Sequence, residues 1–165
     1  MGEPVGAELV SRLFDSHARA LVLYARQLCT DPEDAVQEAF LKLSEQRCAP
    51  REPLPWLFRV VRNEALMASR SNRRRTQRES RAAETKEAWF RNSSPESSDQ
   101  AAVAAAVARL PLDQREIVTA HVWGGLTFRE IGDLMGMSDS SAHRGYQQAL
   151  EQLRRELDWS EKEQS

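Results

Sequence analysis

The sequence predicts an all-α protein of two small helical domains joined by a flexible linker, the C-terminal one a helix-turn-helix domain. Three observations support this fold class. Ala, Leu, Glu, Arg and Gln dominate the 165 residues, and these residue types favour helices. Adjacent β-branched residues such as Val60–Val61 are few, which disfavours strands. Apolar residues recur at steps of three and four between breaks that contain Pro or Gly, as in amphipathic helices.

Two helices are predicted near the N-terminus. Apolar residues between 8 and 28 lie on one helical stripe, and the Thr-Asp-Pro run at residues 30–32 ends it. Asp31 is then the expected N-cap of a second helix, with Pro32 at its first position. This helix extends to about Gln46.

A third helix is predicted after a loop that contains Pro50, Pro53 and Pro55, because proline interrupts regular structure. The helix extends from about Trp56 to Arg70 or beyond. Residues 59–91 contain ten basic and four acidic residues, although the whole chain has a formal charge of −2. We therefore expect a local basic stripe, which points to an anionic partner.

The Ser-rich run at residues 92–98 is typical of a linker. The predicted domains are accordingly 1–75 and 99–159, with residues 76–98 between them. In the second domain, a helix is expected from Gln100 to Leu110. Asp113 with Glu116 forms a capping-box pattern for a helix that ends near Trp123.

A helix-turn-helix is predicted over residues 127–148. Thr127 with Glu130 is a second capping-box pattern, Gly136 suits a left-handed C-cap, and Ser138 precedes the last helix. The second helix of such a motif enters the DNA major groove. The candidate DNA-reading residues are Ser140, Ser141, His143, Arg144, Gln147 and Gln148, and the candidate phosphate contacts are Thr127 and Arg129.

An ordinary helical hairpin is the alternative interpretation of this pattern. Residues 109–165 contain seven basic and ten acidic residues, so the affinity of this domain alone for DNA should be weak.

Four segments add further information: DPEDAVQEAFLKL at 31–43, PWLFRVVRN at 55–63, LPLDQRE at 110–116 and GLTFREI at 125–131. In this order they resemble bacterial RNA polymerase sigma factors of the extracytoplasmic-function (ECF) type, in the sigma-70 family. The resemblance covers about residues 9–157. It implies an alternative sigma factor that binds core RNA polymerase and recognises the −10 and −35 promoter elements.

The resemblance also implies residue roles. The helix at 32–46 would bind the β′ clamp helices of polymerase through Asp34, Gln37, Glu38, Leu41 and Lys42, and the C-terminal domain would contact the β flap. The −10 DNA would meet Trp56, Arg59, Arg62, Asn63, Arg70, Arg73 and Arg74. Without the resemblance, a solvated helix face is the simpler interpretation of residues 34–42, and core packing is the simpler one of Trp56.

Two residues depart from the family pattern. Gly145 and His143 occupy positions where the family commonly has basic residues. The loss of a phosphate contact at Gly145 predicts weaker or unusual recognition of the −35 element.

The sequence contains no pattern typical of an enzyme, a cofactor site or a metal site. Cys29 and Cys48 have no metal spacing, and we expect free thiols. Neither a signal peptide nor a membrane-spanning run is found, so a cytoplasmic protein is expected. An anti-sigma factor is a further partner that the resemblance implies.

Two competing functions stay open at this point. A stand-alone helix-turn-helix regulator would explain residues 127–150 but not the N-terminal segments. A sigma-like adaptor that does not read DNA would fit Gly145 and the acidic C-terminal domain.

Overall fold

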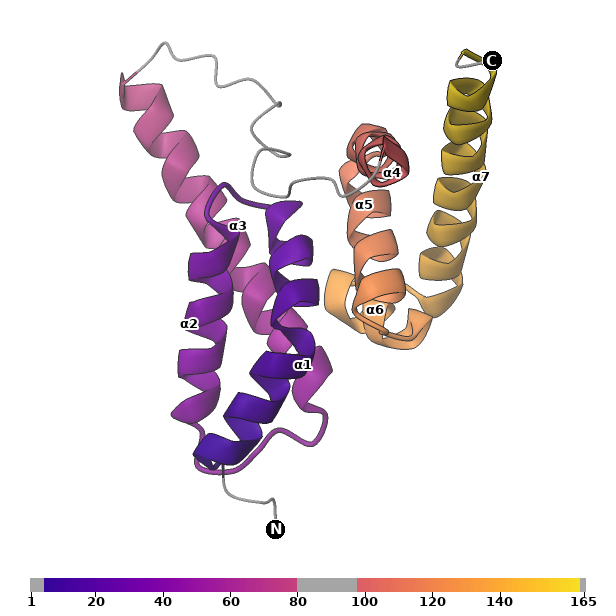
Figure 1. Cartoon of the computed structure of the whole chain (residues 1–165). Coiled ribbons are helices and arrows are strands. Elements are labelled where there is room, and N and C mark those ends of the chain that lie inside the picture. Colours follow the sequence, from indigo (N-terminus) through magenta and orange to yellow (C-terminus); the bar gives the residue numbers. More distant parts are fainter. Residues whose placement is uncertain (1–4, 80–97, 164–165) are drawn as a thin grey trace.

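The computed structural model describes residues 5–79 and 98–163, with side chains over 5–78 and 99–158. Every regular element in these ranges is helical (Figure 1), which confirms the all-α fold class. In chain order the elements are α1 (Ala7–Arg26), α2 (Pro32–Ser44), α3 (Pro53–Glu79), α4 (Ser98–Arg109), α5 (Leu112–Val118), the π-helical turn η2 (Thr119–Trp123), α6 (Phe128–Met135) and α7 (Asp139–Glu163).

Helices α1, α2 and α3 pack together as the N-terminal half, residues 5–79. Their common core includes Leu21, Leu43, Leu57 and Val61, all fully buried. Helix α3 spans 27 residues, or about 40 Å, and its last turns project beyond α1 and α2 (Figure 1). Helix α3 continues past residue 75, where the first domain is predicted to end. The boundaries of the two domains therefore stay a prediction.

Helices α4 to α7 form the C-terminal half, residues 98–163. Two local predictions are confirmed here. The Thr127 hydroxyl accepts a hydrogen bond from the Glu130 amide at 3.2 Å, and the Glu130 carboxylate accepts one from the Thr127 amide at 2.7 Å. Gly136 ends α6 with φ of 72°, the left-handed conformation that glycine adopts without strain.

Ser138 caps α7 as expected, because its hydroxyl accepts a hydrogen bond from the Ser141 amide at 3.1 Å. The turn between α6 and α7 is therefore fixed by short-range hydrogen bonds. Such local bonding explains why sequence spacing located this motif.

The predicted N-cap position of Asp31 is confirmed, whereas the predicted capping box of Asp113 and Glu116 is wrong. Asp31 stands at the N-cap of α2, but its side chain makes no capping hydrogen bond. Helix α5 begins after Pro111, and the carboxylate of Asp113 accepts a hydrogen bond from the adjacent Gln114 amide. Glu116 does not reach back to close a capping box. It is only 3% exposed and points into the molecule.

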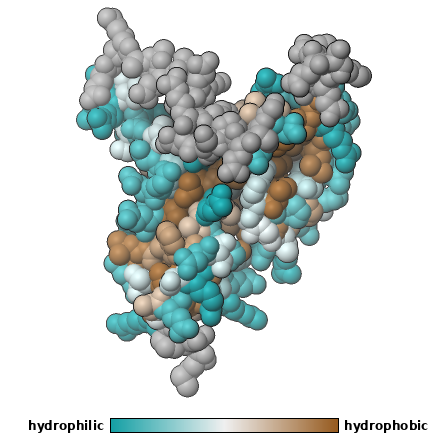
Figure 2. All heavy atoms as spheres, in the orientation of Figure 1, coloured by the Kyte–Doolittle hydropathy of each residue, from teal (hydrophilic) through white to brown (hydrophobic). Residues whose placement is uncertain are grey.

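The two halves share one buried cluster. Tyr24 and Phe58 of the N-terminal half belong to the same apolar core as Ile117, Ala120 and Leu126 of the C-terminal half. Figure 2 shows hydrophobic side chains gathered along the junction between the halves. The halves are thus closed against each other by apolar burial, which stabilises contacts in proportion to the area removed from water.

The halves also approach each other closely at Gly124. A Cβ atom built there would stand 2.5 Å from Cζ of Phe58, a distance that the hard-sphere radii of carbon forbid. The absence of a side chain at Gly124 therefore leaves room for the aromatic ring of Phe58 on α3. Within residues 5–79 and 98–163, no helix is both long and apolar enough to cross a membrane.

Candidate polymerase and nucleic-acid interfaces

Helix α2 presents the predicted polymerase residues on its outer side. Asp34, Gln37 and Leu41 are exposed, and Leu41 retains 53% exposure, which is high for a large apolar side chain. Glu38 and Lys42 are half-buried. Acidic and amide groups around one exposed leucine suit a partner helix that is basic and partly apolar.

Lys42 has a structural partner within the same half. Its ammonium group donates to the carboxylate of Glu64 on α3. This hydrogen bond raises the pKa of Lys42 above its ordinary value. Lys42 therefore ties α2 to α3, and its side chain is less available to a partner than those of Asp34 and Gln37.

One face of α3 carries most of the residues expected at −10 DNA. Arg59 and Asn63 are four residues apart and both exposed, so they lie on the same side of the helix. Arg70, Arg73 and Arg74 continue this side into the projecting turns and are also exposed. Their spacing gives a basic strip along α3. Trp56 is half-buried and packs against the core at the helix start.

Arg62 differs from its neighbours on α3. Its Nε atom donates to Oε2 of Glu116 on α5 at 2.9 Å, and its side chain is only 24% exposed. The hydroxyl of Tyr24 on α1 donates to the same carboxylate oxygen at 2.8 Å. The structure therefore places Arg62 in a polar cluster between the halves, not on the exposed strip.

Burial shapes the protonation of this cluster. Desolvation, followed by the charge of Glu116, raises the pKa of Tyr24 well above its ordinary value, so the phenol stays a hydrogen-bond donor at neutral pH. Burial by itself lowers the pKa of Arg62, but the hydrogen bond and charge of Glu116 raise it on balance. The cluster holds one anion, one cation and one neutral donor.

Sequence reasoning missed the importance of Glu116 and Tyr24. The spacing of Asp113 and Glu116 predicts a capping box, and Tyr24 lies within the apolar stripe of residues 8–28. The one available signal was that Glu116 directly precedes the apolar pair Ile117–Val118, which is unusual for a solvated carboxylate.

The helix-turn-helix residues gather on one surface at the start of α7 and α6. Ser141 is half-buried and accepts a hydrogen bond from the Ser138 hydroxyl at 2.9 Å, so its hydroxyl supports the turn. A shallow depression lies between Phe128, Arg129, Ser140 and Arg144. The other predicted DNA residues are exposed: Thr127, Arg129, Ser140, His143, Arg144, Gln147 and Gln148.

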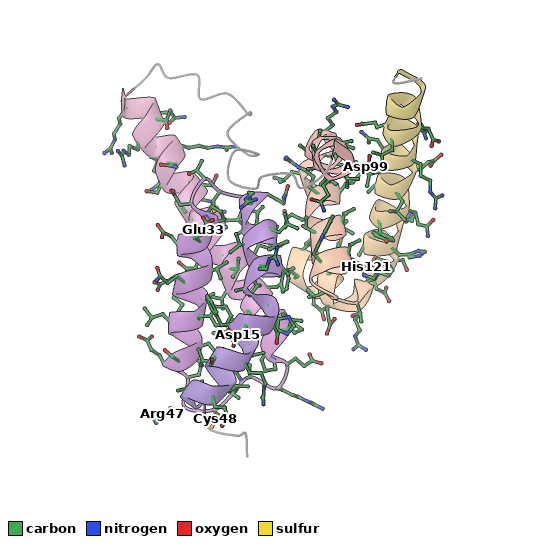
Figure 3. All side chains as sticks on the ribbon, in the orientation of Figure 1. Asp15, Glu33, Arg47, Cys48, Asp99 and His121 are labelled. Carbon is green, nitrogen blue, oxygen red and sulfur yellow. The ribbon has the colours of Figure 1, made fainter. Side chains whose placement is uncertain are left out.

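An aromatic cluster fixes the orientation of α7 against α6. Phe128 stacks on His121 with ring centroids 4.4 Å apart, and it meets the rings of His143 at 4.9 Å and Tyr146 at 5.3 Å. His121, labelled in Figure 3, is itself fixed by a 2.7 Å hydrogen bond between its Nδ1 atom and the Leu126 carbonyl. His143 is thus held by Phe128 on one side while the rest of its ring stays exposed.

His143 and Gln147 lie four residues apart on α7, and their side-chain nitrogens are 3.3 Å from each other. Arg144 stands 3.4 Å from the Ser141 hydroxyl and is otherwise exposed. Several long side chains that can donate or accept hydrogen bonds therefore lie together near the start of α7, the helix expected to enter the major groove.

The unusual glycine at position 145 has a packing reason. A Cβ atom at Gly145 would lie 2.7 Å from Cδ1 of Ile117 on α5. Gly145 therefore faces α5 and permits a close approach of the two helices. This position points partly inward, whereas Arg144 points to solvent.

No group of three or more His, Cys, Asp and Glu side chains that could hold a metal occurs among the residues that the structure describes. Both cysteines are free thiols, Cys29 buried and Cys48 exposed. Burial raises the pKa of Cys29, which disfavours the reactive thiolate.

Comparisons with known proteins match each half of the chain to a region of the sigma-70 family. Residues 13–75 match the family model for sigma-70 region 2, and residues 100–153 match the model for sigma-70, region 4. The probable RNA polymerase sigma factor RfaY of Xanthomonas campestris pv. campestris is 31% identical over 135 residues, which are 76% of this chain. The chain spans about a third of the length of that relative, 34%.

Two solved structures have a similar fold. The sigma factor RpoE, in complex with the anti-sigma factor NepR from Bartonella quintana, matches with a TM-score of 0.69 and 20% identity over 93% of this chain and 98% of that chain. CnrH, in complex with the cytosolic domain of CnrY, matches with a TM-score of 0.62 and 22% identity over 93% of this chain and 90% of that chain.

Proposed function

Since this chain belongs to the sigma-70 family and is an ECF-type sigma factor, we propose that it binds core RNA polymerase and directs promoter-specific initiation. The observation that carries the proposal is the pairing of two sigma regions with two separate candidate DNA surfaces, one on α3 and one on α7. The chain itself performs no chemistry in this role. It supplies recognition to an enzyme that synthesises RNA.

The exposed strip on α3 is proposed to contact the −10 element. Promoter opening requires side chains that bind a single strand along its backbone and at its bases. Arg59 supplies a charge beside the amide of Asn63, and the arginines of the projecting turns extend the contact toward duplex DNA. Trp56 supports this surface from the core side.

The start of α7 is proposed to read the −35 element. Arg144 can pair bidentately with guanine, and Gln147 or Gln148 can pair with adenine. Thr127 and Arg129 precede the groove-facing helix, are exposed, and are proposed to contact phosphates. Each DNA contact is weak alone, and attachment of both halves to one polymerase raises their effective concentration.

Core polymerase is proposed to bind both halves. The β′ clamp helices would occupy the α2 face around Leu41. The β flap would cover exposed apolar residues of the C-terminal half, namely Val103, Leu112, Val122 and Trp123. A cytoplasmic location follows from this partner. An anti-sigma protein is a further proposed partner, supported by the fold shared with RpoE, which was solved in complex with one.

The α2 face gives a direct test of polymerase binding. Alanine at Asp34, Gln37 and Glu38 together is expected to raise the dissociation constant for core polymerase by at least about tenfold, because a few central interface residues carry most of the binding energy. Affinity would be measured by fluorescence anisotropy of labelled protein titrated with polymerase.

A matched control is Glu151→Ala, which removes one exposed carboxylate from α7 in the other half. This variant should bind polymerase like the parent. Equal affinity of the triple variant and the parent would show that α2 is not the polymerase surface.

A further inference from the structure

We propose that Tyr24, Arg62 and Glu116 form a latch between the halves, which keeps the protein closed and withholds Arg62 from DNA. The first part of this inference rests on contacts within the chain alone. The second part rests on the proposed function, because it assigns Arg62 to the −10 surface once the latch opens.

The burial of Glu116 depends on hydrogen-bond donors from the N-terminal half. Glu116 is 3% exposed, and the side chains that donate hydrogen bonds to its carboxylate, Tyr24 and Arg62, both come from the other half. A buried carboxylate without partners is strongly disfavoured. Glu116 in the closed form is thus stable only because the N-terminal half is docked on α5.

The surrounding side chains exclude water from the latch. The ring of Tyr24 meets that of Phe58 edge to face, with centroids 5.1 Å apart. Phe58 in turn occupies the space that Gly124 leaves free. The polar cluster therefore sits beside the apolar contact, and separation of the halves would hydrate both at once.

Each half retains packing of its own when the latch opens. Helices α1 to α3 bury Leu21, Leu43 and Val61 among themselves. Helices α4 to α7 have a separate cluster of Leu110, Val118 and Ala149. Opening therefore exposes the junction without dissolving either half, as a rigid-body transition requires.

The latch competes with DNA for one guanidinium group. Arg62 follows Arg59 by three residues, so it lies next to the exposed strip on α3. While Nε of Arg62 is bonded to Glu116 at 2.9 Å, its side chain is only 24% exposed, so less of the guanidinium group is accessible to a DNA strand. A strand that binds Arg62 thus favours the open form, and by linkage any change that opens the latch favours the strand.

The first test measures the distance between the halves. A dye pair would be attached to the exposed Cys48 and to a cysteine introduced by Asp158→Cys on α7, while the buried Cys29 stays unlabelled. Cys48 lies at the far end of the N-terminal half (Figure 3). Energy-transfer efficiency is expected to fall in Glu116→Gln and, to a smaller extent, in Tyr24→Phe.

The matched control is Glu156→Gln. Glu156 is also a partly buried carboxylate bonded to an arginine, but its partner Arg109 belongs to the same half, at 3.2 Å. This variant should keep the parent energy transfer. Unchanged transfer in both Glu116→Gln and Tyr24→Phe, with helical circular dichroism retained, would overturn the latch.

The second test measures binding of the free full chain to a single-stranded oligonucleotide of −10 sequence. Glu116→Gln should bind about fivefold or more tightly than Glu156→Gln, because the competent population rises. Both variants remove one negative charge, so the effect of net charge on DNA affinity is the same in the two proteins. Equal affinities despite lower energy transfer would show that the latch does not withhold Arg62. Absence of binding by every protein would contradict the −10 role itself, while the distance measurement would still decide the latch.

Discussion

Alanine at both Arg59 and Asn63 is expected to lower open-complex formation by at least about tenfold, while the affinity for core polymerase stays unchanged. Both side chains are exposed on one face of α3. Hydrogen bonds to charged groups contribute about 1.5–3 kcal/mol each. Loss of two such contacts to an unpaired strand therefore acts on DNA melting and not on polymerase docking at α2.

The measurement is permanganate reactivity of unpaired thymines on a promoter that this protein recognises with polymerase. Arg19→Ala is the control, because Arg19 is an exposed arginine of α1 away from the strip. If the double variant forms open complexes as well as Arg19→Ala does, the α3 strip has no role in strand opening.

Arg144→Ala should weaken binding of the holoenzyme to the −35 element by about tenfold, within the 1–3 kcal/mol that one good base contact contributes. Arg144 is exposed at the reading end of α7, while Phe128 and its aromatic partners fix the helix that carries it. The substitution removes a contact without disturbing that cluster, so thermal stability should change little.

Competition binding to duplexes that differ only in the −35 sequence checks this expectation. Arg155→Ala is the control on the same helix, since Arg155 pairs with Glu151 at 2.9 Å away from the reading end. If Arg144→Ala and Arg155→Ala discriminate equally well among the duplexes, Arg144 does not read bases.

Features set by neighbours in sequence were predictable. The capping box of Thr127 and Glu130 and the left-handed Gly136 depend on residues no more than a few positions apart, so spacing alone located them. The start of α2 at Pro32 followed from the fixed φ of proline. The length of α3 was less clear, because the apolar periodicity fades after Arg70 and the remaining turns are mostly arginine and polar residues.

Features set by distant partners were not predictable. The spacing of Asp113 and Glu116 is typical of a capping box at a helix start. The hydrogen-bond partners of Glu116 instead lie 92 residues away at Tyr24 and 54 residues away at Arg62. The same non-local contact takes Arg62 off the exposed strip. At Gly145, a departure from the family pattern suggested a lost phosphate contact, whereas its close approach to Ile117 reveals a packing constraint. Local spacing in a single sequence does not show which residues of the two halves contact each other.

Run-off transcription with bacterial core RNA polymerase, with and without this protein, tests the central claim most directly. Templates would be a promoter library from the source genome. The account predicts new discrete start sites that appear only when the protein is present and share sequence elements near −10 and −35. Polymerase binding without any new start site would favour an adaptor. Failure to bind polymerase at all would contradict the account and leave a stand-alone DNA-binding regulator.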